Sequence, residues 1–120
     1  IEKHAPRLDF RVKFEKPGKY AIWVRGLSAN GESDTCHVGH NGKLNASMKK
    51  LGSFGSTPKW MRTTLDKKAA EFDVKNAGWA TVNVFMREDG FMCDAILLTQ
   101  NLKYVPQDAE PESPQTPEKP

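Results

Sequence analysis

Indole rings beside cationic side chains are the combination in this sequence best suited to recognition chemistry. Trp23 is followed two residues later by Arg25, and Trp60 lies next to Lys59 and close to Arg62. The face of an indole stacks on the apolar side of a pyranose ring, and planar polar groups bond the hydroxyls. We therefore expect Trp23, Arg25 and Trp60 to contact a saccharide, provided that their side chains are exposed.

Each of these tryptophans also has a structural interpretation. Trp60 follows an irregular stretch, so it fills either an exposed stacking position or one end of a core. Trp23 and Arg25 alternate onto the same strand face, where they form either a binding platform or a cation–π packing contact. Trp79 directly follows Gly78 and is expected to pack at the end of a strand.

His37, His40 and Asn41 form a second group of polar candidates. Alternation along a strand places His37 and His40 on opposite faces, which disfavours a shared metal site. Asn41 begins an Asn-Gly pair, which predicts a tight turn. We expect the three side chains to make surface hydrogen bonds, to solvent or to ligand.

The sequence Arg87-Glu88-Asp89-Gly90 permits three interpretations. A glycosidase needs two carboxyl groups that converge on one bond, whereas adjacent strand residues point to opposite faces. An Asp-Gly turn with an Arg–Glu pair is an ordinary hairpin device. Arg87 and Glu88 at the rim of a loop would also bond sugar hydroxyls or a sulfate group.

Several function classes lack support in the 120 residues. There is no Ser/His/Asp order, phosphate loop, HExxH or Cys/His pattern, so we do not expect an enzyme. No apolar stretch reaches the length that spans a membrane. Nothing resembles the aromatic strand motifs of RNA-recognition domains, so we do not expect nucleic acid as the partner.

Charge is divided unevenly along the chain. Residues 106–120 hold five prolines, four acidic side chains and one lysine, a composition typical of an extended linker. Residues 1–105 form the expected domain and hold 17 basic and 11 acidic side chains, a net charge of +6. This excess favours an acidic or sulfated partner, although lysines on a solvated surface would give the same count.

Cys36 and Cys93 are too few for a four-ligand zinc site, and no CxxC pair exists. Each lies in a segment that resembles a strand. They are therefore either two buried free thiols or, in a secreted protein, one disulfide.

Alternation of apolar and polar residues predicts a series of strands. Segment 8–14, LDFRVKF, alternates throughout, and segment 20–25, YAIWVR, places Trp23 and Arg25 on the face opposite Ile22. The turn residues between these segments predict that they pair as a hairpin. Further strands are expected at 35–38, 60–65, 71–74, 79–87 and 91–99.

Residues 43–59 are the least regular part of the chain, because glycine, serine and proline interrupt every period. We expect a long loop there, and long loops in compact domains often carry function. Short strands separated by turn signals, with no helical period between them, predict an all-β fold, an antiparallel β-sandwich.

Three segments in order, KPGKYAIWVRG, SDTCHVGHNGK and GWATVNVFMREDGFMCDAILLT, resemble the carbohydrate-binding modules of families 6 and 35. These are β-jelly-roll domains attached to polysaccharide-degrading enzymes. The resemblance implies a jelly roll and a non-catalytic module that holds a polysaccharide near a tethered catalytic domain. It also implies a secreted, monomeric protein.

Two features depart from the pattern of that family. Met92 stands where many members have an asparagine that contacts sugar. Asp94 matches an aspartate that, in the family, holds a structural calcium ion together with paired glutamates on the first strand. Residues 1–10 contain no such pair, which is what a chain lacking the family's first strand would show. The resemblance thus implies Asp94 as the metal ligand, with calcium as the candidate cofactor.

A second hypothesis belongs to a different functional class. The same sandwich would serve as a protein–protein interaction or scaffold domain without sugar binding, and the Met92 departure favours this alternative.

Overall fold

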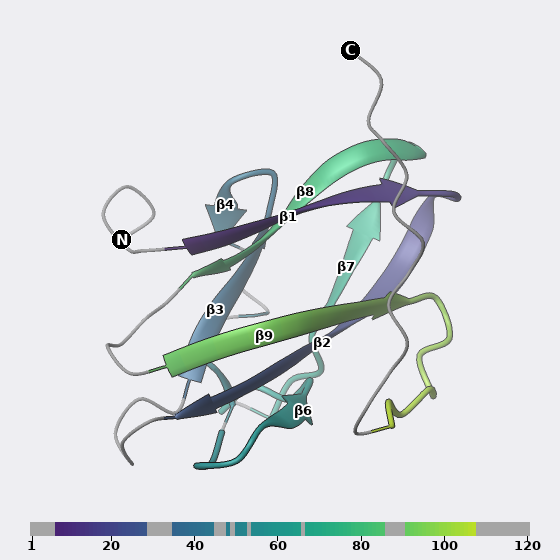
Figure 1. The fold of residues 1–120 in the computed structure, drawn as a ribbon. Helices are drawn as coiled ribbons and strands as arrows, with labels where there is room; N and C mark the ends of the chain where they lie inside the picture. The colour runs from purple at the N-terminus through teal and green to yellow at the C-terminus, as the bar shows by residue number, and fades with distance from the viewer. Residues whose placement is uncertain are drawn as a thin grey trace.

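The structure, a computed structural model, describes residues 7–28, 35–44, 48, 50–52, 54–65, 67–85 and 91–107. Over these residues the chain forms two antiparallel β-sheets and no α-helix, so the expected antiparallel β-sandwich is confirmed (Figure 1). Among the same residues, no helix is long and apolar enough to cross a membrane.

The first sheet is built around strand β8 (Gly78–Phe85). It pairs along its whole length with β1 (Arg7–Phe14), from Arg7 opposite Phe85 to Phe14 opposite Gly78. On its other side it pairs with β3 (Thr35–His40). Two short strands, β4 (Lys43–Leu44) and β5 (Leu51–Gly52), complete this sheet along β3.

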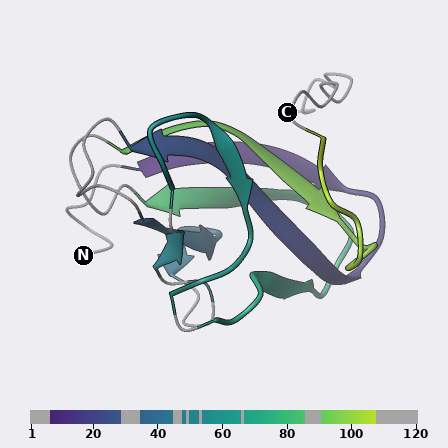
Figure 2. The ribbon, with the colours of Figure 1, turned by 90° about the horizontal axis from the view of Figure 1, so that it is seen from below.

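The second sheet is built around strand β2 (Gly18–Ser28). One edge of β2 pairs with β9 (Phe91–Thr99). The other edge is shared by β7 (Glu71–Val74), opposite the first residues of β2, and β6 (Lys59–Met61), opposite Val24 to Gly26. Figure 2 shows β2 and β9 side by side, with residues 100–107 turning away from the end of β9.

Alternation along the central strands fills the space between the sheets. Ile22 and Val24 of β2, Val38 of β3, and Val82 and Val84 of β8 are fully buried and belong to one apolar core. Burying each such side chain contributes about 1.5–3 kcal/mol relative to leaving it in water. The face of β2 that carries Trp23 and Arg25 must then point outward.

The expected hairpin between segments 8–14 and 20–25 is wrong, because β1 and β2 lie in different sheets. The rings of Phe14 and Tyr20 meet edge to face across the interior, with centroids 4.9 Å apart. Both strands have an apolar face to bury, and two strands that face each other across a sandwich bury both faces at once. The turn at Pro17 and Gly18 therefore leads from one sheet to the other.

The long loop expected at residues 43–59 is also wrong for those residues of the stretch that the structure describes. That stretch contributes β4, β5 and the start of β6. Met48, Leu51 and Phe54 are buried in the core, and the Phe54 ring packs against Phe91 with centroids 4.8 Å apart. These residues close one side of the sandwich, so the segment has a packing role.

Candidate functional site

The outward face of the second sheet brings Trp23, Arg25 and Trp60 together. Trp23 and Arg25 lie on the outward side of β2, and Arg25 pairs directly with Trp60 of β6. Trp23 and Trp60 are thus diagonal neighbours on adjacent strands, within reach of each other's side chains. All three side chains are half-buried, and none belongs to the core. The structural alternative for Trp60, a core position, is therefore wrong.

A bulge in β9 adds a carboxylate to this face. Arg25 pairs with Ala95 and Gly26 pairs with Cys93, so Asp94 is the extra residue of β9. Asp94 points outward and its carboxylate accepts a hydrogen bond from the Arg25 guanidinium in an ion pair. Bulges re-aim side chains in this way. The pair neutralises the charge that Arg25 brings to the surface.

Close approach of the strands at the bulge requires a glycine in β2. A Cβ atom added to Gly26 would lie 2.6 Å from the Met92 carbonyl oxygen and 2.9 Å from the Phe91 ring. Any larger residue at this position would push β9 away from β2. The position of Asp94 opposite Arg25 therefore depends on Gly26.

Trp60 is partly covered by the residues that follow β9. Its indole nitrogen, Nε1, donates a hydrogen bond of 2.9 Å to the backbone carbonyl of Gln107. Trp23 differs, because its buried Nε1 has no hydrogen-bond acceptor among the described residues. Leu97 of β9 lies directly opposite Trp23, so this end of the face is apolar.

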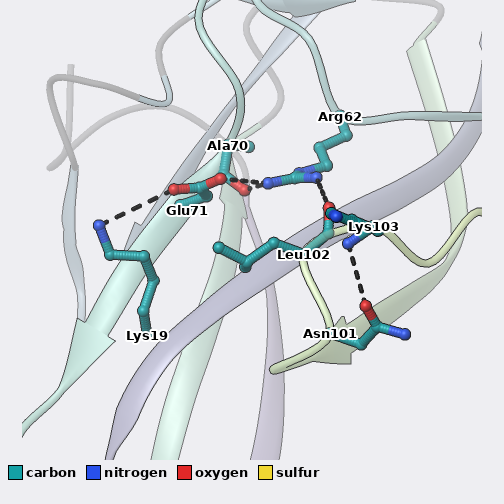
Figure 3. A network of polar contacts seen from close by, with 7 residues as sticks. All are labelled: Lys19, Arg62, Ala70, Glu71, Asn101, Leu102 and Lys103. Atoms are coloured by element: carbon teal, nitrogen blue, oxygen red, sulfur yellow. Dashed lines mark hydrogen bonds and ion pairs between the residues drawn. The ribbon is translucent and has the colours of Figure 1, made fainter.

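Arg62 bonds several groups beside this face, and sequence reasoning gave it no role of its own. Its guanidinium forms an ion pair with Glu71 and donates to the carbonyl of Leu102 at 2.8 Å (Figure 3). The ammonium group of Lys19 lies 3.9 Å from the other oxygen of Glu71. The position of Arg62 two residues after Trp60 was the available signal, but Glu71 and Leu102 lie 9 and 40 positions away in the sequence.

The two histidines lie away from this face, on opposite sides of the first sheet as expected. The ring of His40 faces the core and packs 5.1 Å from the Phe72 ring, centroid to centroid. Burial lowers the pKa of His40 below its usual value. His37 was expected to make surface hydrogen bonds, but it is buried, and its Nδ1 accepts from the Lys50 amide at 2.9 Å.

Asn41 has a structural role at the expected turn between β3 and β4. Its φ of 52° and that of Gly42, 85°, are those of a two-residue hairpin turn. The Asn41 side chain accepts a hydrogen bond from the Thr81 amide, and its own amide donates to the Thr81 carbonyl. These bonds tie the turn to β8, on the sheet that does not carry Trp23 and Trp60.

Trp79 lies at the start of β8, opposite Lys13 on β1. The Arg11 guanidinium lies over its ring, 5.9 Å from the centroid. Arg11 also donates to the Thr81 hydroxyl at 3.1 Å. Trp79 thus packs at the end of a strand, as expected, on the outer face of the first sheet.

The remaining candidates are placed as follows. Arg87 and Glu88 lie outside the described residues. Asp94 is paired with Arg25, and no group of three or more His, Cys, Asp or Glu side chains within the described ranges is arranged to hold a metal ion. Calcium at Asp94 stays a prediction.

Cys36 and Cys93 are free thiols on opposite sheets. Burial raises the pKa of Cys36 well above its usual value and that of Cys93 to about 11. Both thiols are therefore protonated at neutral pH and are poor nucleophiles.

Comparison with known proteins finds a relative but no family. No family model matches the chain. The chain is similar to an uncharacterised protein of Formosa agariphila, with 36% identity over 113 residues. The match covers 87% of this chain but only 27% of that protein, so the chain spans a minor part of the length of its relative.

Proposed function

We propose that this chain is a non-catalytic polysaccharide-binding module whose ligand lies on the outer face of the second sheet. The observation that supports the proposal is the pairing of Arg25 with Trp60, which places these two residues on the same outward face as Trp23. Stacking by the exposed parts of Trp23 and Trp60 would bind the apolar faces of sugar rings. Arg25 and Asp94, held as a pair on the same surface, would bond the hydroxyls.

The net charge of the chain suggests the class of polysaccharide. Arg25 and Arg62 are each paired with a carboxylate on this face. Residues 1–105 nevertheless carry a net charge of +6, which favours a polymer with carboxylate or sulfate groups. Binding of such a polymer should weaken as salt is raised from about 0.05 M to 0.5 M.

The module would act by keeping an attached catalytic domain close to its polysaccharide, which raises the local concentration of substrate. The match to a minor part of a longer relative supports this modular role. A secreted protein that works as a monomer is the setting that we propose.

The test is affinity electrophoresis in gels containing neutral, uronate-rich or sulfated polysaccharides. Trp23→Ala and Trp60→Ala should each lose the retardation that the parent chain shows. Trp79→Ala, which removes an indole from the first sheet, is the matched control and should be retarded like the parent. Thermal unfolding of all four proteins must show that they are folded.

Two outcomes would contradict the proposal. One is no retardation of the parent chain by any polysaccharide, and the other is equal loss in all three tryptophan variants. The competing function is a protein-binding sandwich, favoured by the exposed apolar side chains of Leu65, Met92 and Val105. That alternative would be supported if the double variant, with both Trp23 and Trp60 replaced, still bound a protein partner as the parent chain does.

A further inference from the structure

The residues after β9 do not leave the domain directly. The segment 100–107, here called the strap, begins with a turn in which the Lys103 amide donates to the Asn101 side chain at 3.1 Å. The Tyr104 amide donates to the Asn101 carbonyl, also at 3.1 Å. The Gln100 side chain bonds the Pro17 carbonyl at 3.1 Å. These contacts direct the strap back towards the second sheet.

The strap accepts hydrogen bonds from two donors at the outward face of the second sheet. Its Leu102 carbonyl accepts from the Arg62 guanidinium at 2.8 Å, and its Gln107 carbonyl accepts from the Trp60 indole at 2.9 Å (Figure 3 shows the Arg62 contact). Both acceptors are backbone oxygens, and both donors are planar groups of the type that bond sugar oxygens. The strap therefore takes up interactions that a saccharide would need.

Little apolar surface holds the strap in place. Val105 is 70% exposed and Leu102 is 37% exposed. Tyr104 and Pro106 are half-buried. A segment with few buried apolar contacts opens locally at low free-energy cost, compared with the central strands.

On these grounds we propose that the strap is a displaceable competitor for the saccharide site, released when ligand oxygens replace the Leu102 and Gln107 carbonyls on Arg62 and Trp60. The inference rests on the proposed function and adds its regulation. Oxygen atoms of a saccharide are acceptors of the same kind as the two strap carbonyls, so they fit this donor pair. The saccharide binds only while the strap is open. The apparent affinity is therefore the intrinsic affinity multiplied by the fraction of time that the strap is open.

The experiment loosens the strap in the full chain. The double variant Val105→Gly with Pro106→Gly adds backbone freedom at an exposed position and its neighbour, without altering Trp60 or Arg62. The matched control is Ser113→Gly with Pro114→Gly, the same kind of change farther along the chain. Affinity for a neutral, a uronate-rich and a sulfated polysaccharide is measured by titration calorimetry, and hydrogen exchange of the Trp60 indole is followed by nuclear magnetic resonance.

In the loosened variant we expect faster indole exchange at Trp60 and polysaccharide binding that is tighter by about two- to fivefold. The control variant should match the parent chain in both measurements. Saturating ligand should shift the Trp60 indole signal in the parent chain to the position that it has in the ligand-bound loosened variant.

The possible failures are distinguishable. If both the parent and the loosened variant bind polysaccharide equally, or if the loosened variant binds less tightly, the strap is not a competitor and only this inference is overturned. Unchanged indole exchange in the loosened variant also overturns it. If neither protein binds any of the three polysaccharides, the proposed function itself fails.

Discussion

The outer faces of the two sheets obey the same alternation but have different structures. On the first sheet, Asn83 is fully buried although it points outward from β8. Its side chain accepts from the Gly42 amide and donates to Asp9, both at 2.7 Å. On the second sheet, Trp23 and Trp60 stay half-exposed beside paired charges.

This difference shows what alternation decides and what it leaves undecided. Alternation fixes which side chains point outward, and the segments that cover a face then determine whether those side chains remain accessible. The face around Asn83 has its polar groups bonded to one another, as buried polar groups require. Around Trp60, by contrast, the covering segment contributes two hydrogen-bond acceptors, the Leu102 and Gln107 carbonyls. Trp23 and Trp60 therefore stay more accessible than Asn83, and their face is the better candidate for ligand binding.

The largest effect should come from Asn83→Ala, which breaks the two hydrogen bonds of a buried amide. The Gly42 amide then loses its acceptor, and we expect the free energy of unfolding to fall by about 2–3 kcal/mol. Urea unfolding measures this, with Asn76→Ala at an exposed position as the control. Equal stability of the two variants would mean that the hydrogen bonds of Asn83 do not hold the first face together.

The next effect is expected at the bulge that shapes the second face. Gly26→Ala places a Cβ against the Met92 carbonyl, and overpacking of this kind costs about 1–3 kcal/mol. Gly55→Ala is the matched control, because a Cβ at Gly55 would have no atom within 4 Å. Thermal unfolding compares the two variants, and a stable Gly26→Ala variant would contradict the close packing of β2 and β9.

A smaller difference should separate the two arginines of the second face. In the pair of Arg62 with Glu71 the two side chains are 12% and 27% exposed. In the pair of Arg25 with Asp94 they are 22% and 54% exposed. Arg62→Gln should lower the free energy of unfolding by about 1 kcal/mol and Arg25→Gln by at most about half of that, because exposed pairs contribute little. Chemical unfolding of both variants at low and high salt is the measurement. A larger loss for Arg25→Gln would reverse our ranking.

The smallest effect concerns His40, which faces the core between the two sheets. Burial lowers its folded pKa below the usual 6.5, so the unfolded chain binds a proton more readily than the folded chain. Stability should therefore fall as pH drops below 6.5 and level off below the folded pKa. His40→Gln should lessen the difference between unfolding midpoints at about pH 5 and about pH 7.5. An unchanged difference would assign the pH dependence to other groups.

The sequence was informative where apolar segments of strand length were bounded by turn residues. The expected strand at 91–99 coincides with β9, and that at 71–74 with β7. The opposite orientations of Ile22 and Trp23 were predicted because a strand has a period of two. The same rule separated His37 from His40.

Other features depend on contacts between distant residues, which periodicity does not encode. Alternation does not say which strand pairs with which, so the hairpin of β1 and β2 was wrongly predicted. Met48, Leu51 and Phe54 have no regular spacing, and their burial follows from the sandwich around them. The contact between Trp60 and Gln107 joins residues 47 positions apart, so local sequence gives no sign of it.

The pairing of β1 with β8 and of β2 with β9 has a consequence for how the chain acquires its structure. Each sheet joins the first strands of the chain to the last, so loop closure must span most of the sequence before either sheet is complete. During synthesis from the N-terminus, β1 and β2 would lack their main partners until residues 78–99 had emerged. Their apolar faces would be exposed to solvent throughout that interval. The chain would then be most prone to aggregate, and a chaperone would protect it most at that stage.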